Sequence, residues 1–304
     1  MSRRPDADVP PGLLLVDKPG GMTSHDVVAR ARRALSVRKV GHAGTLDPMA
    51  TGLLILGVGA ATRLLGHVGG HGKTYQATIR LGQATVTDDR EGEVLTTTPA
   101  AHLDDDAVRS ALAAQTGPLQ QVPSTVSAVK VDGRRSYDRV RAGETVELAP
   151  RSVTVHRLEV HRITRPTPDL VDVDVTVDCT AGTYIRAIAR DVGAGLAVGG
   201  HLTALRRTAS GPFPVADARV VEDAAASLVA GGGPGFLALT EAARLVFPER
   251  RLTAEEARAL SYGQRIPATG AGGLHAAVDP DGRLAALVED AGSTARVAVG
   301  FPPS

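Results

Sequence analysis

One short segment of the chain, residues 41–52, carries a single acid in a loop bounded by glycines. It reads Gly-His-Ala-Gly-Thr-Leu-Asp-Pro-Met-Ala-Thr-Gly, and its acid is Asp47. Glycine allows backbone angles that other residues avoid, and Pro48 biases Asp47 toward an extended conformation. The apolar run 53–56 that follows is typical of a buried strand. A carboxylate on a stiff loop beside a core strand is a candidate catalytic group, because chemistry collects on loops carried by rigid scaffolds.

Asp47 and Tyr75 each have a simpler interpretation when taken alone. An Asp-Pro pair is more often a turn in which the aspartate caps its own backbone. Residues 73–81 alternate strictly between apolar and polar side chains, which predicts a strand with Tyr75 on its apolar face. That pattern by itself favours a core aromatic over a functional one.

Basic residues gather on both sides of this candidate site in the sequence. Residues 24–42 contain five Lys or Arg against one Asp, and residues 124–141 contain five against two, although the net charge of the whole chain is only +1. Basic patches beside a reactive loop suit a polyanion such as nucleic acid. Solvated faces balanced by acids elsewhere explain the same charge pattern equally well.

Composition indicates a globular chain without a metal centre. Its 304 residues, 43% hydrophobic, allow one large domain and one small one. Cys179 is the single cysteine, and the nine histidines show no metal-ligand spacing, so we expect no metal centre. The acidic string 88–93 does not fit a calcium loop and is interpreted as a turn. With no secretory signal and no apolar run of membrane-spanning length, we expect a cytoplasmic protein.

The elements that must hold these residues follow from hydrophobic period and capping. A capping-box pair, Thr23 and Asp26, predicts a helix from 23 to about 35. Further helices are expected at 60–68, 104–115, 182–192 and 253–260, and further strands at 13–16, 53–56, 152–164, 170–179, 274–278, 284–288 and 295–299. The strands 152–164 and 170–179 are expected to pair antiparallel, and the last three to form a small β barrel. The segment 117–151 has little regular period, and an irregular connection of this length is usually functional.

Four motifs, taken together, resemble those of bacterial tRNA pseudouridine synthases of the TruB type. Segment 41–52 meets the family's active-site pattern G-H-x-G-T/S-L-D-P-x-A-T/S-G at every specified position. The other three are Lys73-x-Tyr75, the run from Gly182 to Arg186, and the run 205–208. Segment 117–151 resembles the family's RNA-gripping thumb, with one proline where two are usual and Val126 where an aromatic is common. The motifs span about residues 12 to 213, which is roughly two-thirds of the chain.

The resemblance implies an α+β fold: a mixed, mainly antiparallel sheet flanked by helices, with an inserted thumb and a small C-terminal PUA-like β barrel. We expect a disordered N-terminus at 1–11 and a catalytic domain at 12–247 with the thumb at about 118–151. A PUA-like RNA-binding domain is expected at 248–304.

The resemblance also implies a reaction and its residues. The family isomerises the uridine at position 55, in the T loop of tRNA, to pseudouridine without metal or cofactor, so the partner expected is the T arm and T loop of tRNA. No membrane and no obligatory protein partner are expected. The catalytic residues implied are Asp47, its cationic partner Arg186, and Tyr75 for stacking on the flipped base. The substrate-binding residues implied are His42, Tyr184, Leu205 and Lys18, and the RNA-binding ones are Arg38, Lys39, Lys130, Arg134 and Arg206.

Two other classes stay open at this point. One is an RNA-binding protein with an inert pocket, against which the intact set of Asp47, Tyr75 and Arg186 argues. The other is a hydrolase that uses Asp47 with a second carboxylate as acid and base. No second acid stands in a comparably rigid motif, which argues against the hydrolase.

Overall fold

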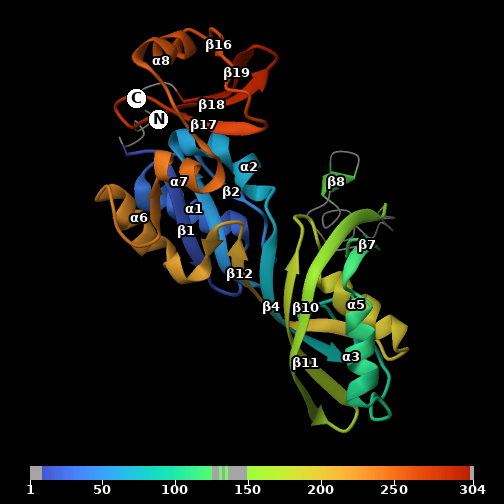
Figure 1. Ribbon diagram of the computed structural model, residues 1–304. Helices are drawn as coiled ribbons and strands as arrows, with labels where there is room; N and C mark the ends of the chain where they lie inside the picture. The colour runs from blue at the N-terminus through green and yellow to red at the C-terminus, as the bar shows by residue number, and fades with distance from the viewer. Residues whose placement is uncertain (1–8, 125–129, 132–133, 136–148, 302–304) are drawn as a thin grey trace.

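A ten-stranded, mainly antiparallel sheet runs through the larger part of the molecule (Figure 1). The computed structural model describes residues 9–124, 130–131, 134–135 and 149–301. The strand order is β14 (Phe236–Ala238), β1 (Gly12–Lys18), β3 (Thr51–Val58), β12 (Gly200–Ser210), β4 (Lys73–Leu81), β11 (Leu170–Cys179), β10 (Arg151–Thr167) and β7 (Gly117–Gln121). β2 (Val40–Ala43) pairs with β3, and β13 (Phe213–Pro214) pairs with β12. Among the described strands of this sheet, only β3 and β12 pair in parallel, over two residue pairs.

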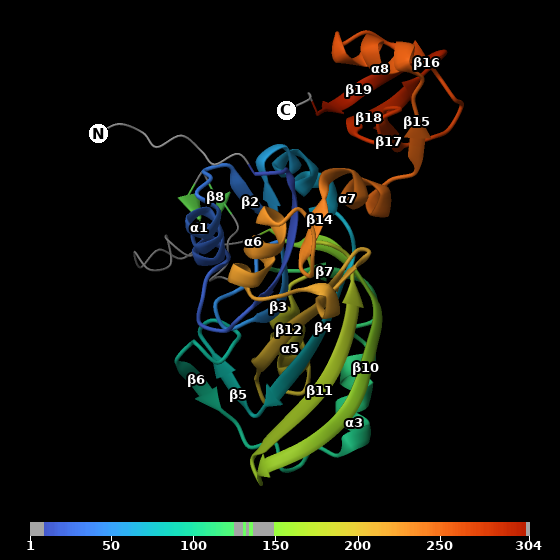
Figure 2. The same ribbon diagram turned by 90° about the vertical axis from the view of Figure 1, so that its left-hand side faces the viewer.

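Helices cover one face of both halves of the sheet. α1 (Ser24–Leu35) packs on α6 (Val221–Val229) beside β1, as Figure 2 shows. α1 begins at Thr23 with the predicted capping box, and its Val27, Val28, Ala31 and Leu35 are buried. α5 (Ile185–Gly195) packs on β12 and β4, and α3 (Asp105–Ala113), capped by Asp104, packs on β10. These helices and the sheet share one continuous apolar core.

The strand β4 shows why the second half of the sheet has one apolar and one polar face. Tyr75, Ile79 and their apolar neighbours along the strand are buried in the core, as the alternation predicts. The opposite face carries polar cross-strand pairs, among them Thr78 with Asp174 at 2.7 Å. The predicted antiparallel pairing of the strands 152–164 and 170–179 is confirmed by β10 and β11.

The C-terminal part forms a second, five-stranded sheet in the order β15-β17-β18-β19-β16. Its elements are α7 (Leu239–Val246), β15 (Glu249–Arg251), α8 (Ala254–Ser261), β16 (Ile266–Pro267), β17 (Leu274–Val278), β18 (Leu284–Ala291) and β19 (Thr294–Gly300). Leu284, Leu287 and Phe301 join a core cluster with Leu13 and Ile55 of the large sheet. This shared core seats the C-terminal sheet, at the top of Figure 1, on the edge of the larger part.

Several boundaries differ from those predicted. The helix expected from 182 begins at Ile185, because Tyr184 is still extended with φ −98°. The expected helix 60–68 is a 3-10 segment, η1 (Gly59–Leu64), followed by α2 (Leu65–Gly69). The remaining short elements are the hairpin β5 (Gln83–Thr85) and β6 (Val94–Thr97), the hairpin β8 (Lys130–Val131) and β9 (Arg134–Arg135), and η2 (Val215–Asp217). Most of the predicted thumb lies outside the described residues.

No helix within the described ranges is both long enough and apolar enough to cross a membrane.

Candidate active site

The loop that carries Asp47 joins β2 to β3 and is pinned at several points. Ser24 Oγ, at the start of α1, donates to the Leu46 carbonyl at 3.1 Å and accepts from the Leu46 amide at 2.9 Å. The Gly21 amide donates to the Pro48 carbonyl at 2.8 Å. The carboxylate therefore stands on a backbone that the N-terminus of α1 and the preceding turn hold in place.

Lys18 also holds this loop, through hydrogen bonds to its backbone and to the preceding turn. Its side chain is fully buried, and Nζ donates to the carbonyls of Pro19, Met22 and Pro48 at 2.9, 2.6 and 3.2 Å. Burial lowers the pKa of Lys18 to about 8, although the nearby Asp47 carboxylate acts in the opposite direction. Lys18 was expected to contact the substrate. In the structure its ammonium donates to backbone carbonyls, and Lys18 is not among the residues that line the cavity described below.

Arg186, in the first turn of α5, contacts Asp47 side-on. Nε lies 3.0 Å from Asp47 Oδ2, and Nη2 donates to Oδ1 at 3.1 Å. The arginine side chain is 4% exposed, whereas the Asp47 side chain keeps 34% of its surface accessible. Burial raises the pKa of Asp47, and the Arg186 guanidinium is the strongest influence that lowers it. The cation predicted against Asp47 is thus present, in the planar two-bond geometry that only arginine provides.

A second carboxylate, Asp89, holds the far side of the same guanidinium. Arg186 Nη1 donates to the Thr87 carbonyl at 2.8 Å and lies 3.4 Å from Asp89 Oδ2. Asp89 is buried and accepts from Thr87 Oγ1 at 2.5 Å and from the Glu91 amide at 3.0 Å. Interpreting 88–93 only as a turn therefore missed a functional contact. The positive φ of Asp88, 58°, shows that the turn is real, but turn chemistry alone does not reveal the arginine it meets.

The cavity at Asp47 has a volume of about 420 Å³. Its walls come mainly from the Asp47 loop, β4, β12 and the segment leading into α5, with these lining residues: Gly44, Thr45, Leu46, Asp47, Gly69, Lys73, Tyr75, Arg151, Gly182, Thr183, Tyr184, Ile185, Arg186, Leu205 and Arg207. Tyr75, Tyr184 and Leu205 were predicted from the sequence and lie together here. Burial raises the pKa of the Tyr75 phenol, which therefore stays protonated at neutral pH.

Two further buried cations line this cavity and were not predicted as site residues. Arg207 is 1% exposed, and it donates through Nε to the Leu53 carbonyl at 2.7 Å and through Nη2 to the Gly44 carbonyl at 2.9 Å. Lys73 is buried, and its Nζ donates to the carbonyls of Gly69 and His71 at 2.9 and 2.7 Å. Arg207 and Tyr75 are register partners on neighbouring strands, so strand pairing is the signal that could have found Arg207.

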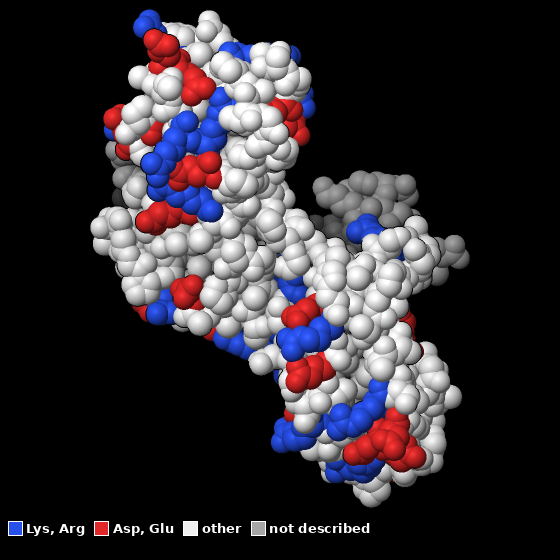
Figure 3. Space-filling view, in the orientation of Figure 1, with Lys and Arg blue, Asp and Glu red and all other residues white. Residues whose placement is uncertain are grey.

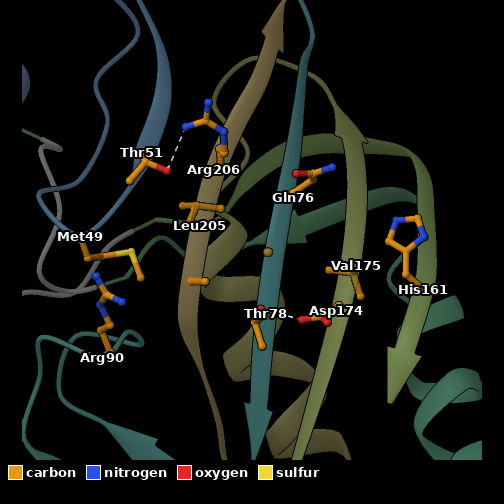
Figure 4. A pocket seen from close by; sticks show the side chains of 12 residues that line it. Met49, Thr51, Gln76, Thr78, Arg90, His161, Asp174, Val175, Leu205 and Arg206 are labelled. Atoms are coloured by element: carbon orange, nitrogen blue, oxygen red, sulfur yellow. Dashed lines mark hydrogen bonds between the residues drawn. The ribbon is translucent and has the colours of Figure 1, made fainter. Parts of the chain in front are cut away.

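Arg206 points to the other face of the sheet, because consecutive strand residues alternate. There it pairs with Asp17 through two bonds, of 2.9 and 2.7 Å, and lines a separate cavity of about 460 Å³ with Gln76 and His161 (Figure 4). That cavity is slightly larger, but it contains neither Asp47 nor Arg186, so we assign the chemistry to the smaller one. In Figure 3, basic and acidic side chains lie next to one another on the visible face rather than forming one basic surface.

The remaining predicted residues are four candidates for RNA contact and His42, which was predicted to bind the substrate. Arg38 and Lys39 are exposed on the segment between α1 and β2. The ring of His42, on β2, packs edge-on against the ring of His25, with centroids 5.4 Å apart. Lys130 and Arg134 lie in the short hairpin of β8 and β9. Within the described residues, no group of three His, Cys, Asp or Glu side chains could hold a metal ion.

This geometry suits chemistry at a nucleoside. A carboxylate oriented by a guanidinium can attack an electrophilic carbon or stabilise positive charge, and the aromatic and aliphatic walls fit a flat ring.

Family models match most of the chain. Residues 32–185 match the TruB family pseudouridylate synthase N-terminal domain, residues 186–230 the tRNA pseudouridylate synthase B C-terminal domain, and residues 247–302 the tRNA pseudouridine synthase II C-terminal domain. A protein of Paenarthrobacter aurescens named tRNA pseudouridine synthase B is 55% identical over 302 residues, covering 96% of this chain and 95% of that protein. A Thermobifida fusca protein of the same name is 53% identical over 296 residues, covering 96% and 99%.

Solved structures agree with the fold. The crystal structure of a Cbf5-Nop10-Gar1 complex contains a chain that matches with a TM-score of 0.71 at 26% identity, over 96% of this chain and 85% of that chain. The predicted α+β fold, with a sheet flanked by helices and a C-terminal PUA-like part, is confirmed. From these matches, the chain belongs to the TruB family of pseudouridylate synthases.

Proposed function

We propose that this protein converts the uridine at position 55 of the tRNA T loop to pseudouridine. The observation that carries the proposal is the side-on contact between Asp47 and Arg186 in the lining of a cavity of about 420 Å³. Relatives named tRNA pseudouridine synthase B match nearly the whole chain, which supports tRNA as the substrate. We also propose that the protein works in the cytoplasm, where tRNA is found.

The reaction breaks the bond between ribose C1′ and uracil N1 and forms a bond between C1′ and C5. Asp47 is the group that attacks or stabilises the reacting carbon while the uracil is detached. It must be ionised, yet burial raises its pKa, and Arg186 is placed to counter that effect. Because Arg186 is itself held by the Thr87 carbonyl and Asp89, the carboxylate is fixed in direction as well as in charge.

The remaining walls account for substrate binding. A uridine stacked within RNA cannot reach a cavity of this kind, so the nucleotide must be flipped out of its stack. The ring of Tyr75 then stacks on the base, and Leu205 and Tyr184 form the rest of the wall. Arg38, Lys39, Lys130 and Arg134 are proposed to contact phosphates outside the cavity.

The hydrolase alternative receives little support from the second carboxylate. Asp89 is within reach of Arg186, but it does not line the cavity and its oxygens already have partners at Thr87, Glu91 and Arg186. An acid and base pair that cleaves a glycosidic bond needs both carboxyl groups at the substrate. The pocket of a pure RNA-binding protein would have no need for a carboxylate held in this way.

Purified protein incubated with transcribed tRNA, without added metal, tests the proposal. We expect pseudouridine to form at position 55 alone, detected by release of the hydrogen on C5 and by mapping the modified position. The matched control is a transcript with cytidine at position 55. Absence of product from the uridine transcript, with tRNA binding intact, would contradict the proposal.

A further inference from the structure

The cavity contains more buried positive charge than Asp47 needs. Arg186 already neutralises Asp47 and is shared with Asp89. Lys73 and Arg207 line the same cavity, and neither forms an ion pair with a carboxylate in the part of the chain that the structure describes. Both donate to backbone carbonyls, and Arg207 also hydrogen-bonds the side chain of Tyr75. Buried cations without a counterion are costly, which indicates that a ligand supplies negative charge.

Lys73 and Arg207 both lie next to Gly44 in the loop that carries Asp47. Gly44 has a φ of +80°, and a Cβ built there would lie 3.3 Å from Arg207 Nη1 and 3.4 Å from Lys73 Cε. The register pairs Arg207 with Tyr75, and Lys73 is two residues before Tyr75 on β4. The two cations therefore form one end of the cavity, on the side of the ring that we propose stacks on the base.

This end is the closed one. Lys73, Tyr75 and Arg207 are all buried, whereas Thr45 and Arg151, which also line the cavity, are exposed and mark its mouth. The phosphates of an RNA strand must enter and leave through the mouth, because the chain continues on both sides of a flipped nucleotide. The base, and not a phosphate, is thus the part that reaches the buried cations.

We propose that Lys73 and Arg207 bind the carbonyl oxygens of the uracil and stabilise the negative charge that it carries when detached. The inference rests on the proposed function. When the C1′–N1 bond breaks, its electron pair stays on the uracil and spreads over N1, O2 and O4. The base rotates, and C5 uses a pair of its π electrons to bond to C1′, which releases C1′ from the Asp47 carboxylate. The proton on C5 is then lost to water and N1 takes up a proton from water, so the product is neutral pseudouridine. Preorganised cations at the oxygens favour the charged state over the neutral substrate.

The test varies the acidity of the uracil that leaves C1′. A packing defect in the cavity would slow cleavage of a more acidic and a less acidic uracil by the same factor. Fluorine at C5 stabilises the uracil anion, so cleavage of 5-fluorouridine needs less help from the protein. Single-turnover cleavage rates are measured on tRNA containing uridine or 5-fluorouridine, for the wild type, Lys73→Met and the charge-preserving control Lys73→Arg. We expect Lys73→Met to lower the rate about tenfold or more on uridine, but at least about threefold less on 5-fluorouridine. Lys73→Arg keeps the charge, so it should lose less activity on uridine than Lys73→Met and show a smaller difference between the two substrates.

Equal losses on both substrates for Lys73→Met would overturn the proposal, because they would indicate a general distortion of the cavity. Arg207→Met removes the donors to the Leu53 and Gly44 carbonyls and risks misfolding. The test therefore relies on the Lys73 variants, and Arg207→Lys is measured as a less disruptive change at Arg207. Filter binding of unmodified tRNA should be unchanged in all folded variants. A wild type that forms no pseudouridine would refute the proposed function instead, so the two failures are distinguishable.

Discussion

Replacing Arg186 by lysine tests the central contact of the site. The guanidinium contacts acceptors on two sides at once. Nε and Nη2 contact the two oxygens of Asp47, and Nη1 donates to the Thr87 carbonyl. A lysine ammonium is a compact charge on a flexible stem and cannot reproduce this planar fork. It retains the positive charge but must give up at least one of these charge-assisted bonds.

The size of the effect follows from that loss. A hydrogen bond to a charged group contributes about 1.5–3 kcal/mol. If the missing bond orients Asp47 in the transition state, the rate falls by roughly 10- to 150-fold, since about 1.4 kcal/mol corresponds to a factor of ten. Arg186→Met removes the cation as well. Because Arg186 lowers a pKa that burial raises, its removal moves the pKa of Asp47 higher, and the acidic limb of the pH–rate profile shifts to higher pH.

Single-turnover rates at saturating protein, measured across the acidic range, provide the assay. Arg80→Lys is the matched control, because Arg80 makes the same side-on pair with Asp172, at 2.8 and 2.7 Å, on the opposite face of the sheet. We expect that control to keep full activity. If Arg186→Lys also keeps full activity and the acidic limb of Arg186→Met stays in place, Arg186 does not govern Asp47, and Lys18 becomes the next cation to test.

Three further outcomes are expected. Asp47→Asn should abolish turnover and leave tRNA binding nearly intact in a filter assay, since it keeps shape and removes charge; turnover within about tenfold of wild type would refute the assignment. Neutralising Lys130 and Arg134 should weaken binding and reduce the log-log salt slope by about one for each phosphate that the protein no longer neutralises, and an unchanged slope would place the RNA elsewhere. Burial, with Arg207 contributing, lowers the pKa of Lys73 to about 8, so the rate of the wild type should decrease above about pH 8. Lys73→Arg should show no such decrease, and identical alkaline limbs of the two pH–rate profiles would contradict the role of Lys73.

Local pattern was sufficient for the elements whose signal is contained within a few residues. Strict alternation located β4 at its observed ends, and the capping pair at Thr23 located the start of α1. The pairing of β3 with β12 could not be predicted in this way, because it joins distant segments over two residue pairs. Gly52 makes that contact possible: a Cβ there would lie 2.3 Å from the Arg207 carbonyl oxygen. The requirement is visible only once both strands are in place.

The site shows the same division between local and long-range information. Asp47 could be found from the glycines and proline around it, while Arg186 and Tyr75 came from resemblance. The contact of Asp89 with Arg186 and the carbonyl partners of Lys18 could not be predicted locally, because both depend on what approaches these residues in the fold. Arg206 was grouped with Leu205 as part of one motif, although alternation along a strand places neighbouring residues on opposite faces. Applying that rule would have moved the expectation from Arg206 to Arg207.

Lys73 makes catalysis and stability respond to pH in opposite directions, and Lys18 adds to the effect on stability. Burial lowers the pKa of both Lys18 and Lys73 to about 8 from an ordinary value of 10.5, so each ammonium is less favourable in the folded chain than in the unfolded one. Stability from these groups therefore rises as pH increases from about 8 toward 10.5. Cys179 opposes this rise above about pH 9, because burial raises its pKa to about 11 from 9.0 and the unfolded thiol ionises first. Between about pH 8 and 9 both lysines raise stability before Cys179 begins to oppose them. For Lys73, the proton that we propose stabilises the uracil anion is therefore one whose loss stabilises the fold.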